Sequence, residues 1–353
     1  MAARTSDRGW NPPALNERQA AVLRAVVAAH VGEAAPVGSE TLTHLLPMSL
    51  SPASVRSVLA ELASLELVEK PHASAGRVPT ERGLRLFVDE LLQAPRLAPY
   101  ERRTITFSLD EAEADRVVTV ASQLLSERTR MLGFVVAPRL ERVALCHLSL
   151  VRLSSERLLA ILVSQDGLAH RRVLEDASGT GQAELDRMAA MLNERVAGRT
   201  LPELREALSG EARVLRDQAE SLLARAIALG SRAVSAEEDD RVDLVIATRL
   251  ALLDQPEFRD PERIRGLFAA LEAKEWLIGV LDQMIGEGGV NVAFGEEMEE
   301  PALRRCALVA ARYGRDESPL GVLGVIGPSR MNFGHVIPLV GYLSHAVTEK
   351  LTA

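Results

Sequence analysis

Apolar positions recur at helical spacing through much of the first hundred residues. Asn16 is a suitable N-cap for a helix that runs to about His30. Ser39 predicts the start of a short second helix, and Pro47 ends it because proline cannot continue the helical hydrogen-bond ladder. The pattern therefore predicts two helices before residue 50.

A third helix is predicted in the segment "LSPASVRSVLAELASLELVEK". Ser51 at the N-cap and Pro52 at the first helical position form a strong start signal. The apolar side chains follow at i, i+3, i+4 and i+7 and form a single stripe that faces a core: Val55, Val58, Leu59 and Leu62.

The opposite face of this third helix is small and almost free of acidic residues. It carries Ala53, Ser57, Ala60 and Ser64, with Ser54 and Arg56 on its flanks. Such a face can lie close in a DNA major groove, where the positive helix N-terminus favours phosphate and the hydroxyls suit base edges. An ordinary surface helix with small residues fits the same pattern about equally well.

The order of the elements favours the DNA-binding reading. Two helices joined by the short turn "LLPMSLS" form a helix-turn-helix pattern. The strand candidate "ELVEK", the polar loop "PHASAGRVPT" and a helix capped by Thr80 come next. Strand, loop and return strand predict the wing of a winged helix.

The remaining chain predicts a mixture of helices and strands. An amphipathic helix is expected from Asp110 to about Arg130, and a helix begins at Pro261. A C-terminal helix is expected around Pro338. Further helices are expected at 182–197 and 202–229, and strands within "GFVVAP", "VALCHLSLVRL", "RLLAILVS" and "LAHRRVL" and at 290–294, 304–312 and 321–327.

The net charge of −8 is distributed unevenly. Residues 1–105 hold 12 Lys and Arg against 11 Asp and Glu, a balance of +1, so the remaining 248 residues hold 29 against 38, a balance of −9. A neutral head on an acidic body remains compatible with DNA binding, because phosphate contact depends on the local arrangement of charge. The two cysteines, 160 positions apart, indicate a reducing, cytoplasmic setting, and no membrane span is expected.

The segments "APVGSETL", "LSPASVRSVLAELASLELVEKPHASAGRVPTERGLRLFVDELL", "LLDQPEFRDPERIRGLFAALE" and "GVLGVIGPSRMNFGHVI" together resemble the HrcA-type heat-inducible transcription repressors of bacteria. The resemblance implies a dimeric repressor that binds double-stranded DNA at an inverted-repeat operator ahead of chaperone operons, with its activity supported by the GroE chaperonin. It further implies an α+β multidomain fold: an N-terminal winged helix-turn-helix, and a GAF-like α+β domain interrupted by an inserted helix-rich dimerisation domain.

Together with the patterns above, the resemblance gives the following division of the chain: a flexible tail at 1–15, the DNA-binding domain at 16–105, the first part of the GAF-like domain at 106–204, the inserted dimerisation domain at 205–285, and the second part of the GAF-like domain at 286–353.

The expected DNA contacts lie on the third helix and the wing: Ser51, Ala53, Ser54, Arg56, Ser57, His72, Ser74, Arg77 and Thr80. The family commonly has Thr-Ile-Arg-Asn where this chain has Ser54, Val55, Arg56 and Ser57. The base contact of that asparagine is therefore not assigned to Ser57.

No catalytic constellation is recognised, so the sequence predicts a non-enzyme without cofactor or metal. "GTGQAE" lacks the third glycine of a dinucleotide loop, and a tight turn is favoured. "GVIGPSRM" can cradle an anion, but a rigid structural turn is preferred over it. Two alternatives concern regulation: a GAF-like domain that senses a small molecule, and a chaperonin client whose folding state is the signal.

Overall fold

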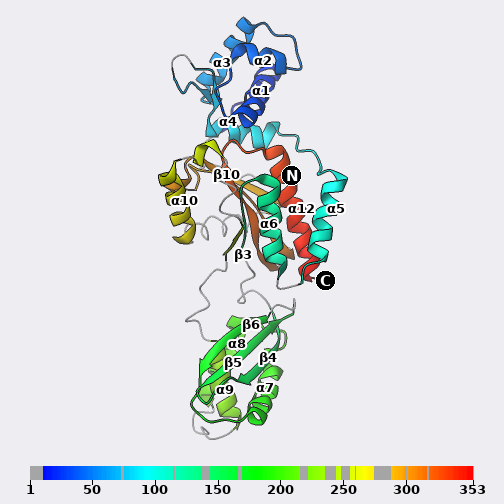
Figure 1. Ribbon diagram of the computed structural model, residues 1–353, viewed down its shortest axis with the longest axis vertical. Coiled ribbons are helices and arrows are strands. Elements are labelled where there is room, and N and C mark those ends of the chain that lie inside the picture. Colours follow the sequence, from blue (N-terminus) through cyan, green and yellow to red (C-terminus); the bar gives the residue numbers. More distant parts are fainter. Residues whose placement is uncertain are drawn as a thin grey trace.

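The chain folds into three units arranged along one long axis (Figure 1). The computed structural model describes residues 11–72, 75–113, 116–136, 144–165, 169–214, 222–234, 244–247, 255–258, 260–273, 288–298, 300–315 and 318–352. We call the three parts the N-terminal unit, residues 11–91, the central unit, built on a five-stranded sheet, and the distal unit, residues 144–234. Helices and strands are mixed in all three.

The N-terminal unit consists of α1 (Glu17–Glu33), α2 (Ser39–Leu45), α3 (Pro52–Ser64), β1 (Val68–Glu69), β2 (Val78–Pro79), α4 (Glu81–Leu86) and the π-helical turn η1 (Phe87–Leu91). Asn16 caps α1 in a capping box, since its side chain accepts from the Gln19 amide and the Gln19 side chain accepts from the Asn16 amide. The predicted cap at Ser39 is wrong: Gly38 occupies the N-cap position and Ser39 is the first helical residue. The second helix therefore begins without a side-chain cap.

The central unit is an antiparallel sheet in the order β7-β3-β10-β9-β8. Its strands are β3 (Leu132–Val136), β7 (Leu244–Ala247), β8 (Val290–Phe294), β9 (Cys306–Arg315) and β10 (Ser318–Pro328). Its helices are α5 (Pro99–Asp110), α6 (Val117–Thr129), α10 (Pro261–Ala273) and α12 (Phe333–Thr352), with short 3-10 turns at η7 (Pro256–Phe258) and η8 (Pro301–Leu303). One apolar cluster covers the α6 and α12 side of the sheet and continues into the N-terminal unit. A second cluster covers the other side with α10.

The distal unit has a sheet and a core of its own. Its strands β4 (Leu145–Arg152), β5 (Arg157–Ser164) and β6 (Ala169–Glu175) form an antiparallel meander. One face of this sheet packs on α7 (Gln182–Val196), α8 (Leu201–Val214) and α9 (Leu222–Ala233). The connections to the central unit leave after β3 and return before β7.

The predicted division at residue 205 does not match this arrangement. It falls inside α8, and the apolar side chains on both of its sides share one core. The expected inserted span 205–285 also contains β7, which pairs with β3 in the central sheet. The segment that forms a separate unit is 144–234, because its three strands and the helices α7, α8 and α9 bury their apolar side chains in one common core.

The secondary structure differs from the expectations at two places. The helix expected from Asp110 begins only at Val117, and Asp110 ends the separate helix α5. Of the helix expected over 202–229, the structure describes α8 and α9, and residues 215–221 lie outside the described residues. Strand β7 was not expected, because its four residues are too few to display an alternating pattern. The acidic stretch 235–241 and the helix expected beyond Ala273 lie outside the described residues.

Candidate nucleic-acid interface

Helix α3 begins with a fully formed cap. The Ser51 hydroxyl oxygen accepts from the Ser54 amide at 3.1 Å and lies 2.9 Å from the Ser54 hydroxyl. Pro52 occupies the first turn, as the sequence predicts. The first turn contains no acidic residue, so the positive end of the helix dipole faces solvent without a compensating carboxylate.

The two faces of α3 separate as the apolar pattern predicts. The buried stripe consists of Val55, Val58, Leu59 and Leu62. The exposed face carries the five α3 positions expected to contact DNA: Ser51, Ala53, Ser54, Arg56 and Ser57. The Arg56 Nε donates to the Pro52 carbonyl at 3.2 Å, which holds the guanidinium along the helix N-terminus. One exposed surface therefore combines a cation, hydroxyls and the N-terminal end of a helix.

The acidic side chains next to this surface are held by neighbours. Gln19 Nε2 donates to the Glu61 carboxylate at 2.9 Å. Glu66, after the end of α3, forms an ion pair with Arg82. Both carboxylates lie toward the C-terminal end of α3, and residues 51–60 themselves carry no negative side chain.

The loop after β1 is anchored at its return strand. Val37 and Arg77 exchange both backbone hydrogen bonds at 2.9 Å, which adds a third extended segment beside β1 and β2. A Cβ at Gly76 would collide with the backbone of Val37, so glycine is required there for close approach and not for a positive φ. His72 is exposed and Arg77 is half-buried, whereas Ser74 lies outside the described residues.

Thr80 differs from the other expected contact residues. Its hydroxyl donates to the Glu66 carbonyl at 2.6 Å and accepts from the Gly83 amide at 3.0 Å, so it caps α4 and ties it to the end of α3. The single donor of the hydroxyl and one of its two acceptor lone pairs are thus used within the protein. We therefore assign Thr80 a structural role.

A buried arginine that no sequence pattern identifies joins the N-terminal unit to the central sheet. Arg85 in α4 is 6% exposed. Its guanidinium donates to the Val292 carbonyl at 2.7 Å, forms a bidentate ion pair with Glu297, and lies 4.7 Å from the centre of the Phe294 ring. Asp89 lies 3.6 Å away from it, on the next turn. The orientation of α3 relative to the central unit therefore depends on these contacts of Arg85 with Val292, Phe294 and Glu297, which we call the joint.

Glu81 lies at the same joint with an altered pKa. Its carboxylate accepts from the Glu296 amide at 3.0 Å. Burial raises its pKa to about 7, and the neighbouring carboxylates of Glu296 and Glu297 act in the same direction. The folded state thus favours the protonated form of Glu81. The resulting contribution to the free energy of unfolding is fully present below pH 4.5, the ordinary pKa of a glutamate, and is lost as the pH rises through about 7.

Glu81→Gln is accordingly expected to remove this pH dependence while keeping an acceptor for the Glu296 amide. The melting temperature of the variant, measured relative to that of the unchanged chain, should rise between about pH 5 and pH 8. Thermal unfolding across that range measures the difference. A difference that stays constant with pH would show that Glu81 does not titrate at the joint.

Arg330 of the "GPSRM" segment holds a second contact between the units. Its guanidinium pairs with Glu257 and donates to the Val31 carbonyl at 3.2 Å and to the Gln255 side chain at 3.1 Å. The arginine is therefore committed to contacts within the protein. This supports the rigid structural turn over an anion cradle.

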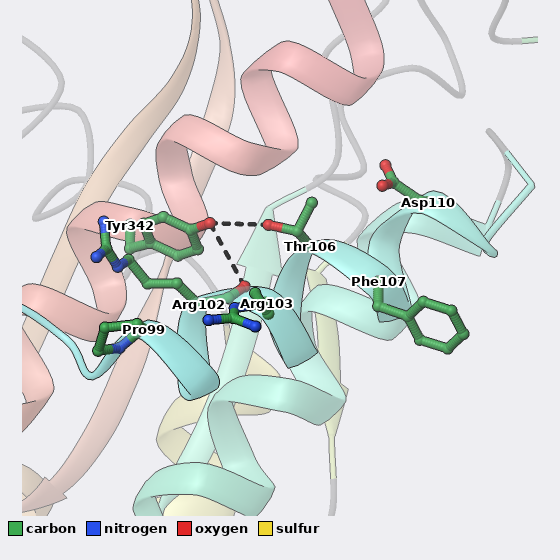
Figure 2. Close-up of a pocket in the computed structure, with 7 residues that line it drawn as sticks. All are labelled: Pro99, Arg102, Arg103, Thr106, Phe107, Asp110 and Tyr342. Carbon is green, nitrogen blue, oxygen red and sulfur yellow. Dashed lines mark hydrogen bonds between the residues drawn. The ribbon is translucent and has the colours of Figure 1, made fainter.

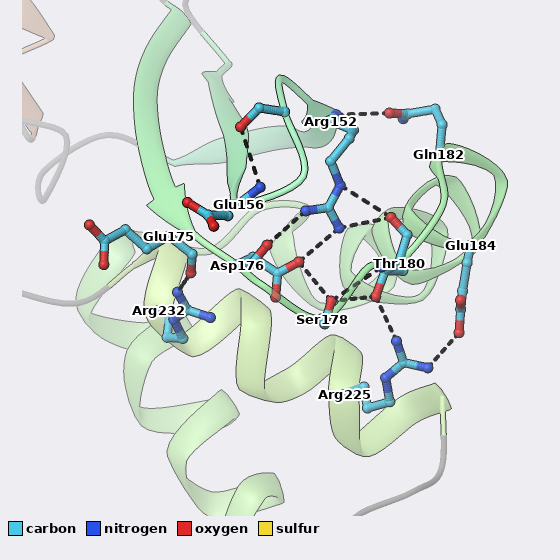
Figure 3. A network of polar contacts seen from close by, with 11 residues as sticks. Arg152, Glu156, Glu175, Asp176, Ser178, Thr180, Gln182, Glu184, Arg225 and Arg232 are labelled. Carbon is cyan, nitrogen blue, oxygen red and sulfur yellow. Dashed lines mark hydrogen bonds and ion pairs between the residues drawn. The ribbon is translucent and has the colours of Figure 1, made fainter.

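The "GTGQAE" segment is likewise a structural turn. Arg152 donates to the Thr180 and Asp176 carbonyls and pairs with the Asp176 carboxylate at 2.8 Å (Figure 3). Arg225 pairs with Glu184 at 2.6 Å and donates to the Thr180 hydroxyl at 2.7 Å. The network closes the loop before α7 onto the sheet, and its charges are matched.

Across the described ranges, three or more His, Cys, Asp or Glu side chains do not gather into a group that could hold a metal ion. No helix within the part of the chain that the structure describes is long and apolar enough to cross a membrane.

The chain matches known proteins along nearly all of its length. Residues 115–337 match the family model described as HrcA protein C terminal domain. The heat-inducible transcription repressor HrcA of Xanthomonas axonopodis pv. citri is 38% identical over 334 residues, covering 94% of this chain and 95% of that protein. Its counterpart in Geobacter sulfurreducens is 36% identical over 339 residues, covering 96% and 98%.

A crystal structure described as a hypothetical protein shares the fold, with a TM-score of 0.64, 20% identity, and coverage of 96% of this chain and 99% of that one. The identities and the coverage of both chains lead to one conclusion: this chain belongs to the HrcA family.

Proposed function

We propose that the protein is a dimeric, sequence-specific transcriptional repressor of heat-shock chaperone operons that binds an inverted-repeat operator. The observation that carries the proposal is the exposed, acid-free N-terminal face of α3. It occurs in a chain whose full-length relatives are named heat-inducible transcription repressors. We expect no catalysis and no cofactor.

In this proposal, residues 16–105 act as a winged helix-turn-helix. Helix α3 enters the major groove of each half-site, where Arg56 and Ser57 reach base edges and the Ser51 end of the helix faces phosphate. The loop that ends at Arg77 is the wing and lies along the backbone or the minor groove, with His72, Ser74 and Arg77 as its contacts. The wing holds α3 in register, and α3 selects the sequence.

The GAF-like and dimerisation roles are assigned to the other two units. The central unit takes the GAF-like role. We move the dimerisation role from 205–285 to the distal unit, whose outer sheet face leaves Leu153 and Val173 each 53% exposed and Val151 36% exposed. A second copy of the same face would cover these apolar side chains.

Ligand sensing by the central unit finds less support. In the described part of the chain, aliphatic and aromatic side chains cover both faces of the central sheet. Side chains thus occupy the positions that a ligand would need.

Footprinting on DNA upstream of chaperone operons tests the proposal. A protected region with two-fold symmetry is the expected result, since a symmetric dimer binds two half-sites about one helical turn or a multiple of it apart. Absence of protection at every chaperone operon of the host would overturn the proposal.

Support by the GroE chaperonin has its own test. Protein prepared without chaperonin should bind the operator weakly, and added chaperonin should restore binding. Equal affinity under both conditions would remove the chaperonin from the proposal and leave operator binding intact.

Arg77→Ala is expected to weaken binding to all DNA sequences by a similar factor. A phosphate contact does not distinguish one base from another. Its loss should make the negative slope of log K against log salt less steep by about one. Titrations of operator and scrambled DNA at several salt concentrations measure both quantities. A loss confined to the operator would instead assign Arg77 to base recognition.

A further inference from the structure

The outer face of α5 carries two exposed aromatic side chains. Tyr100 is 67% exposed and Phe107 62% exposed. Only 3% of the residues in this chain are aromatic. The two positions are seven apart and so lie on one face of the helix, and the Phe107 ring points away from the protein (Figure 2). Exposed aromatic and arginine side chains together are typical of protein interfaces.

Helix α5 is fixed to α12 along its whole length, by contacts that lie at the edge of its exposed face. Glu101 pairs with His335 at 3.0 Å near one end. Thr106 and Tyr342 share a hydroxyl hydrogen bond at 2.8 Å in the middle. Lys350 donates to the main-chain oxygen of Asp110 at 3.0 Å at the other end. The helix is therefore a rigid part of the central unit, and its outer face keeps a fixed position.

The charges on the outer face are self-complementary. Arg102 and Arg103 lie exposed near the N-terminal end, and Asp110 and Glu111 lie exposed at the C-terminal end. Arg102, Arg103 and Asp110 line a shallow hollow of 460 Å³ together with Phe107 and Tyr342. If a second α5 lies antiparallel on this face, each basic end meets an acidic end, whereas a parallel arrangement brings like charges together.

We propose that α5 pairs antiparallel with α5 of a second copy of this chain. In this register Arg103 lies opposite the partner subunit's Asp110, and the aromatic rings cover the middle of the contact. The inference rests on the dimeric repressor proposed above, and it adds a second contact between the two subunits beside that of the distal units.

This second contact sets a distance in the dimer. Helix α5 is about 18 Å long, so the pair buries far less than the roughly 1,000 Å² that a stable dimer needs, and the distal unit must supply the rest. The N-terminal unit is tied to the central unit through Arg85 and Arg330. A fixed α5 pair therefore fixes the separation of the two α3 helices, and with it the spacing of the half-sites.

Disulfide trapping of the full chain tests the pairing. Cys146 is exposed and is first replaced, as Cys146→Ser. Thr106→Cys places a thiol beside the two-fold axis and should give a disulfide dimer. Pro99→Cys, on the same face, lies about 22 Å from its counterpart in the antiparallel register and should stay monomeric under denaturing electrophoresis. Cross-linking at 99, or failure at 106, would overturn the pairing.

Charge reversal tests the register in the Thr106→Cys chain. Arg103→Glu should lower the cross-linking rate about fivefold, because it places two like-charged pairs across the contact. Adding Asp110→Arg should restore the rate, since the pairs are again opposite in charge. Equal rates in all three chains would contradict the register.

DNA binding separates this inference from the proposed function. With the pairing intact, operators whose half-site spacing is altered should bind more weakly than the native operator. Arg103→Glu should reduce this difference in affinity. Normal operator binding without cross-linking at 106 would overturn the α5 contact alone. Cross-linking without any operator binding would overturn the proposed function alone.

Discussion

Replacing Arg85 with alanine is expected to lower the free energy of unfolding by about 3 to 5 kcal/mol, because the change leaves the carboxylate of Glu297 at the joint without its partner. The Val292 carbonyl loses a hydrogen bond and the Phe294 ring loses its cation as well. The N-terminal unit should detach before the central sheet unfolds. Urea denaturation followed by limited proteolysis near residue 95 would measure both effects.

A matched control lies on the same helix. Arg82 also forms an ion pair, with Glu66, but the two side chains are 46% and 68% exposed. Arg82→Ala should therefore cost less than about 1 kcal/mol, because solvent screens an exposed pair. If the two alanine variants unfold at the same urea concentration, Arg85 does not hold the joint.

The second large effect is expected at Arg56. Arg56→Ala should weaken operator binding by about 1 to 3 kcal/mol, or roughly 5- to 150-fold, and relax the preference at one base position in each half-site. Folding should be little affected, because the side chain is exposed and bonds only to the helix that carries it. Selection of binding sites from a randomised operator library would show which base position loses its preference.

Arg24→Ala is the control for charge. Arg24 is an exposed arginine on α1 of the same unit, so its loss changes the net charge equally without altering α3. It should leave base preference unchanged. Unchanged preference in Arg56→Ala and in a Ser57 variant would contradict the base-reading role of α3.

The local features of the N-terminal unit were predictable from sequence because they depend on nearby residues. The Asn16 cap, the Ser51 and Pro52 start and the buried stripe from Val55 to Leu62 each involve positions within a few turns of one another. Ser39 was assigned wrongly because Gly38, which also suits an N-cap, directly precedes it.

Long-range features could not be predicted from sequence in the same way. Arg85 and Glu297 are 212 positions apart, and on a helical pattern Arg85 reads as an ordinary surface arginine. The limits of the distal unit depend on which strands pair, and the apolar runs of β4 and β5 fit either sheet. Thr80 is expected at the DNA because the pattern places a helix cap and the end of the wing at one position, whereas in the structure its hydroxyl proton is donated to the Glu66 carbonyl.

Salt-dependent operator binding tests the central claim most directly. Fluorescence anisotropy of the full chain on the footprinted inverted repeat, from about 50 to 200 mM salt, should give a slope of log K against log salt of roughly −5 to −7 if each half of the proposed dimer makes about three or four phosphate contacts. When Arg77 is replaced by alanine, the slope should become less steep by about one. A slope near zero would contradict binding through α3 and the wing.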